Sequence, residues 1–200
     1  MIRRLVTLVL ALALLLPAAA RAESDAGGTV AHFCDGLIDV MKKGPALGFR
    51  GREARLLPLV STAYDMMAMT RGTLGPAAER LTPAETNDLA DVYTRFSAAV
   101  YADQFASWKG ERCEVGTPHP TPDGRVVVPS RFVSPGGTGT SIDYVLHQDN
   151  GAWKIVDVLF NGTISQVAVR RSEFVSVLRR DGFKGLVAMI QAKTKALEAQ

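Results

Sequence analysis

The stretch that decides the fold runs from Thr140 to Phe160 and reads TSIDYVLHQDNGAWKIVDVLF. Apolar residues recur at every second position before Asp149-Asn150-Gly151, at Ile142, Tyr144 and Leu146, and again after it, at Trp153 and Ile155. Alternation with a period of two is typical of strands that bury one face. Asn-Gly between two such runs favours a tight hairpin turn, because both central residues of that turn need positive φ angles. The sequence therefore predicts two antiparallel strands, Thr140–Gln148 and Ala152–Phe160.

The segments on either side of this hairpin complete the predicted fold. Two more strands are expected upstream, at Glu111–Pro118 and at Arg125–Val133, where Pro129 indicates an edge or a bulge. Helical periodicity and helix-breaking residues predict helices at 29–43 (ended by Gly44-Pro45), two short ones within 46–80 (broken at Pro58), 82–109, 164–180 and 182–197. The order of helices, strands and helices predicts an α+β fold, an antiparallel four-stranded curved sheet wrapped by helices.

The first 22 residues have the pattern of a secretory signal peptide. Arg3 and Arg4 precede a twelve-residue apolar run, and Ala20-Arg21-Ala22 is a typical cleavage signal. The apolar run is too short to span about 30 Å of hydrocarbon. Cleavage after Ala22 would remove three of the 23 basic residues, leaving 20, which equals the number of acidic residues. The mature chain is therefore predicted to be exported and neutral, a charge that does not favour nucleic-acid binding. We predict residues 23–200 to form a single domain, because no linker interrupts them.

The chain lacks the common catalytic and cofactor-binding motifs. It contains no G-x-S-x-G, no G-x-G-x-x-G before a helix, no P-loop and no H-E-x-x-H. The three histidines are scattered over a helix, a loop and a strand, so no metal site and no cofactor are expected. Asp157, inside a predicted strand, could be a general base with a raised pKa. It could equally pair with an arginine such as Arg171 and tie a helix to the sheet, and we favour this structural role.

The two cysteines, Cys34 and Cys113, form an even pair in a chain predicted to enter an oxidising compartment. A disulfide between them and a pair of buried thiols are both compatible with the sequence, because sequence cannot place their Cα atoms within bonding range.

The second half of the chain resembles the MlaC family, also called the toluene-tolerance family, of periplasmic lipid-binding proteins. The resemblance is carried by an ordered set: Tyr144-Val145-Leu146, Gly151-x-Trp153-Lys154-Ile155-Val156-Asp157-Val158, Asn161-Gly162-x-Ile164-Ser165, Arg171-Ser172-x-Phe174 and Gly182-x-x-Gly185-Leu186. Upstream it is carried by Pro58, Tyr64-Asp65-Met66-Met67 and Leu74-Gly75, with Tyr64 in place of the more usual Phe. The segments Leu47–Arg52 and Met67–Gly72 are similar to the hopanoid-biosynthesis-associated branch, HpnM.

This resemblance implies a carrier that shuttles phospholipid between outer- and inner-membrane complexes, with the lipid tails in an apolar pocket. The implied fold is a sheet wrapped by helices, similar to the cone of nuclear transport factor 2. The implied partners are an inner-membrane ABC transporter with an MCE-domain subunit and an outer-membrane lipoprotein complex. A hopanoid-binding carrier, a small periplasmic enzyme using Asp157 on the same cone, and a structural adaptor are the alternatives.

We expect the pocket to be lined by the apolar alternation of the hairpin and by aromatic and apolar positions of the helices. Trp153, Ile155 and Asp157 should share one strand face, with Lys154, Val156, Val158 and Phe160 on the other. The predicted lipid-binding residues are Tyr64, Met67, Phe96, Val100, Phe105, Ile142, Tyr144, Leu146, Trp153 and Ile155.

Overall fold

The computed structural model describes residues 18–199, and the side chains from Ala26 onward. Most of the predicted signal peptide, residues 1–17, lies outside the described residues. The elements are α1 (Ala18–Ala63), α2 (Met66–Leu74), the 3₁₀ helix η1 (Gly75–Arg80), α3 (Pro83–Gln104), β1 (Arg112–Val115), β2 (His119–Pro120), β3 (Val126–Val128), β4 (Ser130–Val133), β5 (Gly139–Asp149), β6 (Ala152–Phe160), β7 (Ile164–Ser165) and α4 (Gln166–Glu198). The predicted α+β order is confirmed.

The sheet is antiparallel and is organised around the long strand β5. β4 and then β3 pair with successive parts of one edge of β5, and β6 pairs with the other edge. β1 extends the sheet beyond β4, β2 beyond β3, and β7 beyond β6. The hairpin turn has the predicted geometry, with φ of 48° at Asn150 and 82° at Gly151.

The sheet has seven strands in the described residues rather than the predicted four. The predicted strand Arg125–Val133 divides at Pro129 into β3 and β4, because proline has no N–H with which to continue a ladder. β2 and β7 have two residues each, which is too short for periodicity to reveal.

A β-bulge in β6 overturns the predicted division of its two faces. Ile155 pairs with Leu146 and Asp157 with Val145, so Val156 is an extra residue without a partner in the register. An extra residue reverses the alternation beyond it. Trp153, Ile155 and Val158 are therefore buried together, whereas Asp157 leaves the face on which it was expected.

Helix α1 consists of two arms joined at Gly48, whose φ of 62° and ψ of 179° are not helical. The predicted stop at Gly44-Pro45 is therefore wrong by one turn. Gly44 instead permits close contact with the loop after α3, since an added Cβ would lie 2.0 Å from the carbonyl oxygen of Ala106. The predicted break at Pro58 is also wrong, because Pro58 lies within the second arm on its exposed side, where water can reach the carbonyl left unbonded.

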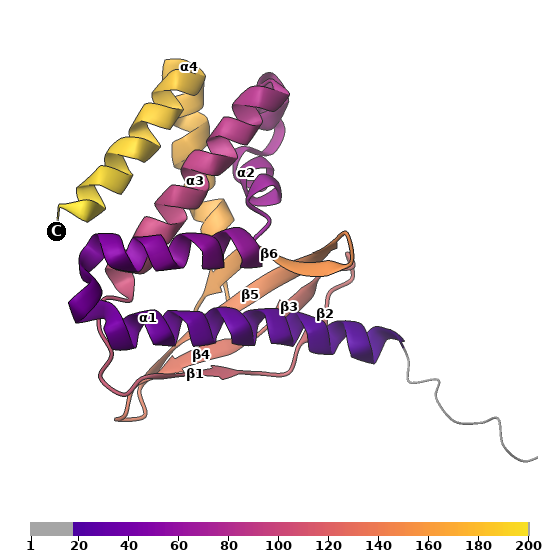
Figure 1. Cartoon of the computed structure of the whole chain (residues 1–200). Helices are drawn as coiled ribbons and strands as arrows, with labels where there is room; N and C mark the ends of the chain where they lie inside the picture. Colours follow the sequence, from indigo (N-terminus) through magenta and orange to yellow (C-terminus); the bar gives the residue numbers. More distant parts are fainter. Residues whose placement is uncertain (1–17, 200) are drawn as a thin grey trace, which may run out of the picture.

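The two arms of α1 lie side by side in front of the sheet, and α2, α3 and α4 gather beside one end of it (Figure 1). A capping box at Thr82, where the helix 82–109 was expected to begin, starts α3. The Glu85 N–H donates to Thr82 Oγ1 over 3.2 Å, and the Thr82 N–H donates to the Glu85 carboxylate over 2.9 Å. α3 ends at Gln104, earlier than the predicted Lys109. α4 bends at Gly182, which separates the two helices predicted there. No helix between Ala18 and Ala199 is both long and apolar enough to cross a membrane.

Candidate functional site

The inner face of the sheet and the helices that cover it enclose one continuous apolar interior. Eight of the ten predicted lipid-binding residues belong to it: Tyr64, Phe96, Phe105, Ile142, Tyr144, Leu146, Trp153 and Ile155. Tyr144, Leu146 and Ile155 are completely buried. These eight side chains come from β5, β6, α3 with its C-cap Phe105, and Tyr64, which directly follows α1.

The two remaining predicted residues occupy the margin of this interior. Val100 is half-buried and packs against the interior, whereas Met67 is half-buried and is not among the residues that form it. Met66 and Met69, on the neighbouring positions of α2, are buried in its place. The segment Met66–Met69 contains no polar residue, so the sequence does not reveal which of its methionines point inward.

Phe33, Tyr64 and Tyr144 of the interior form an aromatic cluster with Tyr101, which is half-buried and packs against the interior. The Phe33 ring meets those of Tyr64 and Tyr101 edge to face at 5.3 Å between centroids, and that of Tyr144 at 6.0 Å. The Tyr64 and Tyr101 hydroxyls form a hydrogen bond of 2.5 Å. Sequence reasoning missed Phe33 and Tyr101 as members of the site, although both lie on predicted helices.

Burial strongly affects the acidity of this cluster. It raises the pKa of Tyr101 from 10.0 to about 12, with the Tyr64 hydroxyl acting in the opposite direction. It raises the pKa of Tyr64 and of Tyr144 well above 10.0, and the neighbouring hydroxyls add to that increase. The cluster is therefore uncharged over the physiological pH range and presents apolar rings with hydroxyl groups.

Two clefts open near the interior, on either side of Lys154. The first, of about 620 Å³, lies between the two arms of α1 and the β5–β6 hairpin and is lined by Gly28, Phe33, Leu59 and Trp153, among others. The second, of about 630 Å³, is lined by Tyr64, Met67 and residues of α3. The Lys154 ammonium between them donates to the Thr62 carbonyl oxygen. In the described part of the chain, the buried Trp153 indole N–H has no hydrogen-bond partner.

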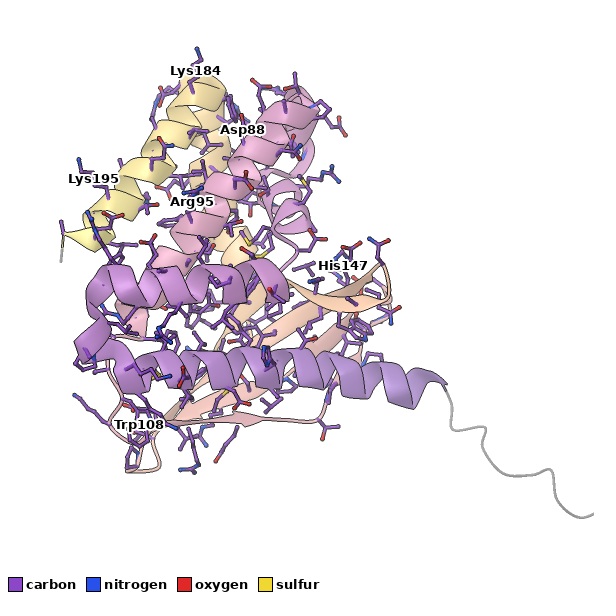
Figure 2. All side chains as sticks on the ribbon, in the orientation of Figure 1. Asp88, Arg95, Trp108, His147, Lys184 and Lys195 are labelled. Atoms are coloured by element: carbon purple, nitrogen blue, oxygen red, sulfur yellow. A yellow bond between two sulfur atoms is a disulfide. The ribbon has the colours of Figure 1, made fainter. Side chains whose placement is uncertain are left out.

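The His147 and Asp65 side chains form a hydrogen bond at the junction of the hairpin and α2. The His147 Nε2 lies 2.8 Å from one Asp65 oxygen, and the other oxygen accepts the Ala68 N–H over 2.8 Å. Figure 2 places His147 at the end of the sheet nearest α2. Asp65 is the N-cap of α2, so this pair fixes the start of that helix against β5. Between residues 18 and 199, no group of three or more His, Cys, Asp or Glu side chains could hold a metal ion.

Asp157 joins β6 to the start of α4. One carboxylate oxygen accepts the Val158 N–H at 2.8 Å and the Val167 N–H at 3.1 Å, and the other accepts the Ser165 hydroxyl at 2.5 Å. The suggested partner was wrong, because Arg171 donates instead to the Gly72 carbonyl oxygen at 2.7 Å. The predicted tie between helix and sheet exists, but it uses backbone N–H groups and a hydroxyl.

Cys34 and Cys113 form a disulfide in the structure, with their Cα atoms 6.0 Å apart. The bond joins the first arm of α1 to β1 at the edge of the sheet. Cys34 is buried in the interior, and Cys113 packs against it. The disulfide therefore links the helical layer that encloses the apolar interior to the sheet on its other side.

The family model named MlaC protein matches residues 32–192 of this chain. The chain belongs to the MlaC family. The match covers both layers, from the first arm of α1 to the second arm of α4, and includes all ten predicted lipid-binding residues. The sequence resemblance drawn from the hairpin and its surroundings is thereby confirmed.

A solved structure shares the fold of this MlaC-family chain. It is the phospholipid-binding protein from Ralstonia solanacearum in complex with a phospholipid, 22% identical, with a TM-score of 0.72. The superposition covers 86% of this chain and 98% of that protein. No curated protein matches the chain.

Proposed function

We propose that this MlaC-family chain is a periplasmic lipid carrier that holds the acyl tails of a phospholipid in the interior between the sheet and the helices. The single observation that carries this proposal is the continuous apolar interior built by α1, α3, β5 and β6. The phospholipid bound to the structurally similar Ralstonia solanacearum protein supports the choice of ligand.

The physical need for such a carrier follows from the hydrophobic effect. A phospholipid has roughly 30 tail methylene groups, and burial of each contributes about 0.8 kcal/mol. Free transit through water therefore costs roughly 20 kcal/mol or more. A protein interior with few polar groups removes that cost, while the charged head group stays in water.

We infer that the tails enter through the cleft between the arms of α1 and the hairpin. Its wall contains the apolar side chains of Phe33, Leu59 and Trp153, which continue into the interior. The indole N–H of Trp153 is buried without a partner in the described residues, so it can donate to an ester oxygen of the lipid once the cleft has opened. Because the completely buried residues beyond the cleft are close-packed, the arms of α1 must separate from the hairpin as the tails enter.

The transport route is proposed from the family. The signal peptide expected in residues 1–22 would deliver the chain to the periplasm. There it would receive lipid from one membrane complex and pass it to another. An inner-membrane ABC transporter with an MCE-domain subunit and an outer-membrane lipoprotein complex would be the partners. This function involves no chemical step, in keeping with the structural role of Asp157.

Substitution of Gly28 by tryptophan is expected to block lipid uptake. Gly28 lines the cleft and is exposed, and a Cβ at this position would have no atom within 4 Å. A tryptophan can therefore fill the cleft without disturbing the fold. Delipidated Gly28→Trp protein should extract at least fivefold less labelled phospholipid from vesicles than the unmodified protein, with a melting temperature within a few degrees of it.

Gly136→Trp is the matched control, because Gly136 lies in the turn between β4 and β5 and a Cβ there also meets nothing within 4 Å. This variant should extract lipid normally. Equal extraction by the Gly28 and Gly136 variants would show that tails do not enter between α1 and the hairpin. Completely buried residues such as Ile155 are less suitable positions for this test, because overpacking itself costs roughly 1–3 kcal/mol.

A further inference from the structure

A cleft lined by four arginines lies away from the proposed lipid entrance. It has a volume of about 710 Å³ and is formed by the end of α2, by η1 and by the first arm of α4. In Figure 1, α2 lies beside α3, with the first arm of α4 behind them. The arginines are Arg80, Arg171, Arg179 and Arg180, and the floor contains apolar residues such as Leu74 and Val175.

The positive charge of this cleft is largely unneutralised. Arg180 pairs with Asp181 at 2.7 Å, and Arg171 donates only to a backbone carbonyl oxygen. The side chains of Arg80 and Arg179 are exposed and make no hydrogen bond or ion pair within residues 18–199. No carboxylate is among the described residues that line the cleft. Since the mature chain has no net charge, this excess reflects a local separation of charge.

The donors in the cleft are suited to phosphate. Guanidinium groups bind phosphate oxygens in pairs, and serine hydroxyls add single donors. Ser172 and Ser176 stand one turn apart on α4 and line the same cleft, and both are exposed.

Two exposed apolar side chains lie just before α4 and in its first turn, on the element that carries three of the four arginines. Val169 is 54% exposed and Ile164 is 49% exposed, and they are two of the three large exposed apolar residues in the described chain. Val169 precedes Ser172 and Ser176 by three and seven positions, so it lies on the same side of α4. Basic side chains beside exposed apolar ones are typical of surfaces that bind the membrane interface. An acidic protein segment would not need the apolar flank.

We propose that the arginine cleft is a docking surface for the phosphate head groups of an anionic phospholipid membrane. This inference goes beyond the carrier function, because the cleft can bind a membrane whether or not the interior holds lipid. It gives the chain a basic surface with which to approach a bilayer.

Vesicle co-sedimentation of the mature protein tests this proposal. Vesicles containing equal parts of phosphatidylglycerol and phosphatidylcholine should bind the protein, and vesicles of phosphatidylcholine alone should bind it much more weakly. Each basic residue near an anionic surface strengthens binding roughly fivefold. The double variant Arg80→Gln/Arg179→Gln should therefore bind anionic vesicles roughly 25-fold more weakly. Raising the salt concentration should weaken binding of the unmodified protein, since exposed charges are screened.

The groove between α3 and the second arm of α4 provides a matched control. It has a similar volume, about 650 Å³, but is lined by charges of both signs, including Asp88, Arg95 and Lys195 (labelled in Figure 2). Arg95→Gln/Lys195→Gln removes the same charge and should change vesicle binding less than threefold. Equal losses in the two double variants would overturn the proposal, because net charge alone would then explain binding.

Two further results would overturn the docking surface independently of the carrier function. One is equal binding of the unmodified protein to anionic and neutral vesicles. The other is tight, arginine-dependent binding to polyglutamate without binding to vesicles, which would assign the cleft to an acidic protein. Both double variants should retain the lipid content of the unmodified protein. Loss of internal lipid in Arg80→Gln/Arg179→Gln would place the cleft in the carrier site and contradict a separate docking role.

Discussion

Replacing Cys34 and Cys113 together by alanine is expected to lower the free energy of unfolding by about 4–5 kcal/mol, as estimated from loop-closure entropy. The disulfide joins residues 79 positions apart, so it restricts a large loop of the unfolded chain. Typical domains are stable by only about 5–15 kcal/mol, so this loss is a large fraction of the total. Urea unfolding of the oxidised protein and of the double variant measures the difference.

Reduction of the unmodified protein provides the control for this prediction. Reductant should shift its unfolding midpoint toward that of the double alanine variant, and should leave the variant unchanged. Peptide mapping of the oxidised protein without reductant should recover the Cys34 and Cys113 peptides joined. Recovery of two free thiols, or a stability difference below about 1 kcal/mol, would contradict the bond and its proposed role.

Alkaline pH is expected to unfold the protein through its tyrosines. All four tyrosines have a pKa raised by burial, that of Tyr101 to about 12. Above pH 10, the unfolded chain loses phenolic protons that the folded protein retains. The tyrosines therefore contribute fully to the free energy of unfolding below pH 10. This contribution falls as the pH rises toward 12, by up to about 1.4 kcal/mol per tyrosine per pH unit.

Phenolate absorbance at 295 nm and far-ultraviolet circular dichroism, followed together from pH 8 to 12.5, test this expectation. The phenolate signal should appear in one cooperative step that coincides with the loss of helical signal. Tyr101→Phe should make the decline in stability less steep, because it removes one of the four titrating groups. Gradual titration centred near pH 10 with the helical signal intact would show that the tyrosines are exposed to water.

Local sequence signals predicted the elements whose geometry depends on few neighbouring residues. Asn150-Gly151 identified the hairpin because positive φ angles are inexpensive only for such residues. Thr82 and Glu85 identified the start of α3 because the capping box is formed within four residues. The eight interior residues were found because burial repeats with the period of each element.

Features that depend on contacts between distant segments were not predictable. The bulge at Val156 depends on the pairing of β6 with Val145 and Leu146, and the adjacent β-branched residues Ile155 and Val156 gave no sign of a change of face. The first arm of α1 ends at Gly48 rather than at Gly44. Gly44 is present because the helix contacts Ala106 there, and the sequence does not show that contact. The arginine cleft combines residues about 100 positions apart, so no window of sequence contains it.

The most direct test of the carrier function is the identity of the lipid in the protein itself. The chain should be purified from the periplasm without detergent, extracted with organic solvent and analysed by mass spectrometry against a phosphorus standard. The carrier account predicts about one phospholipid with two acyl chains per protein molecule. A pentacyclic triterpenoid in its place would identify a hopanoid carrier and contradict the phospholipid assignment. Protein that yields no lipid from the periplasm, and acquires none when incubated with phospholipid vesicles, would contradict the carrier function altogether.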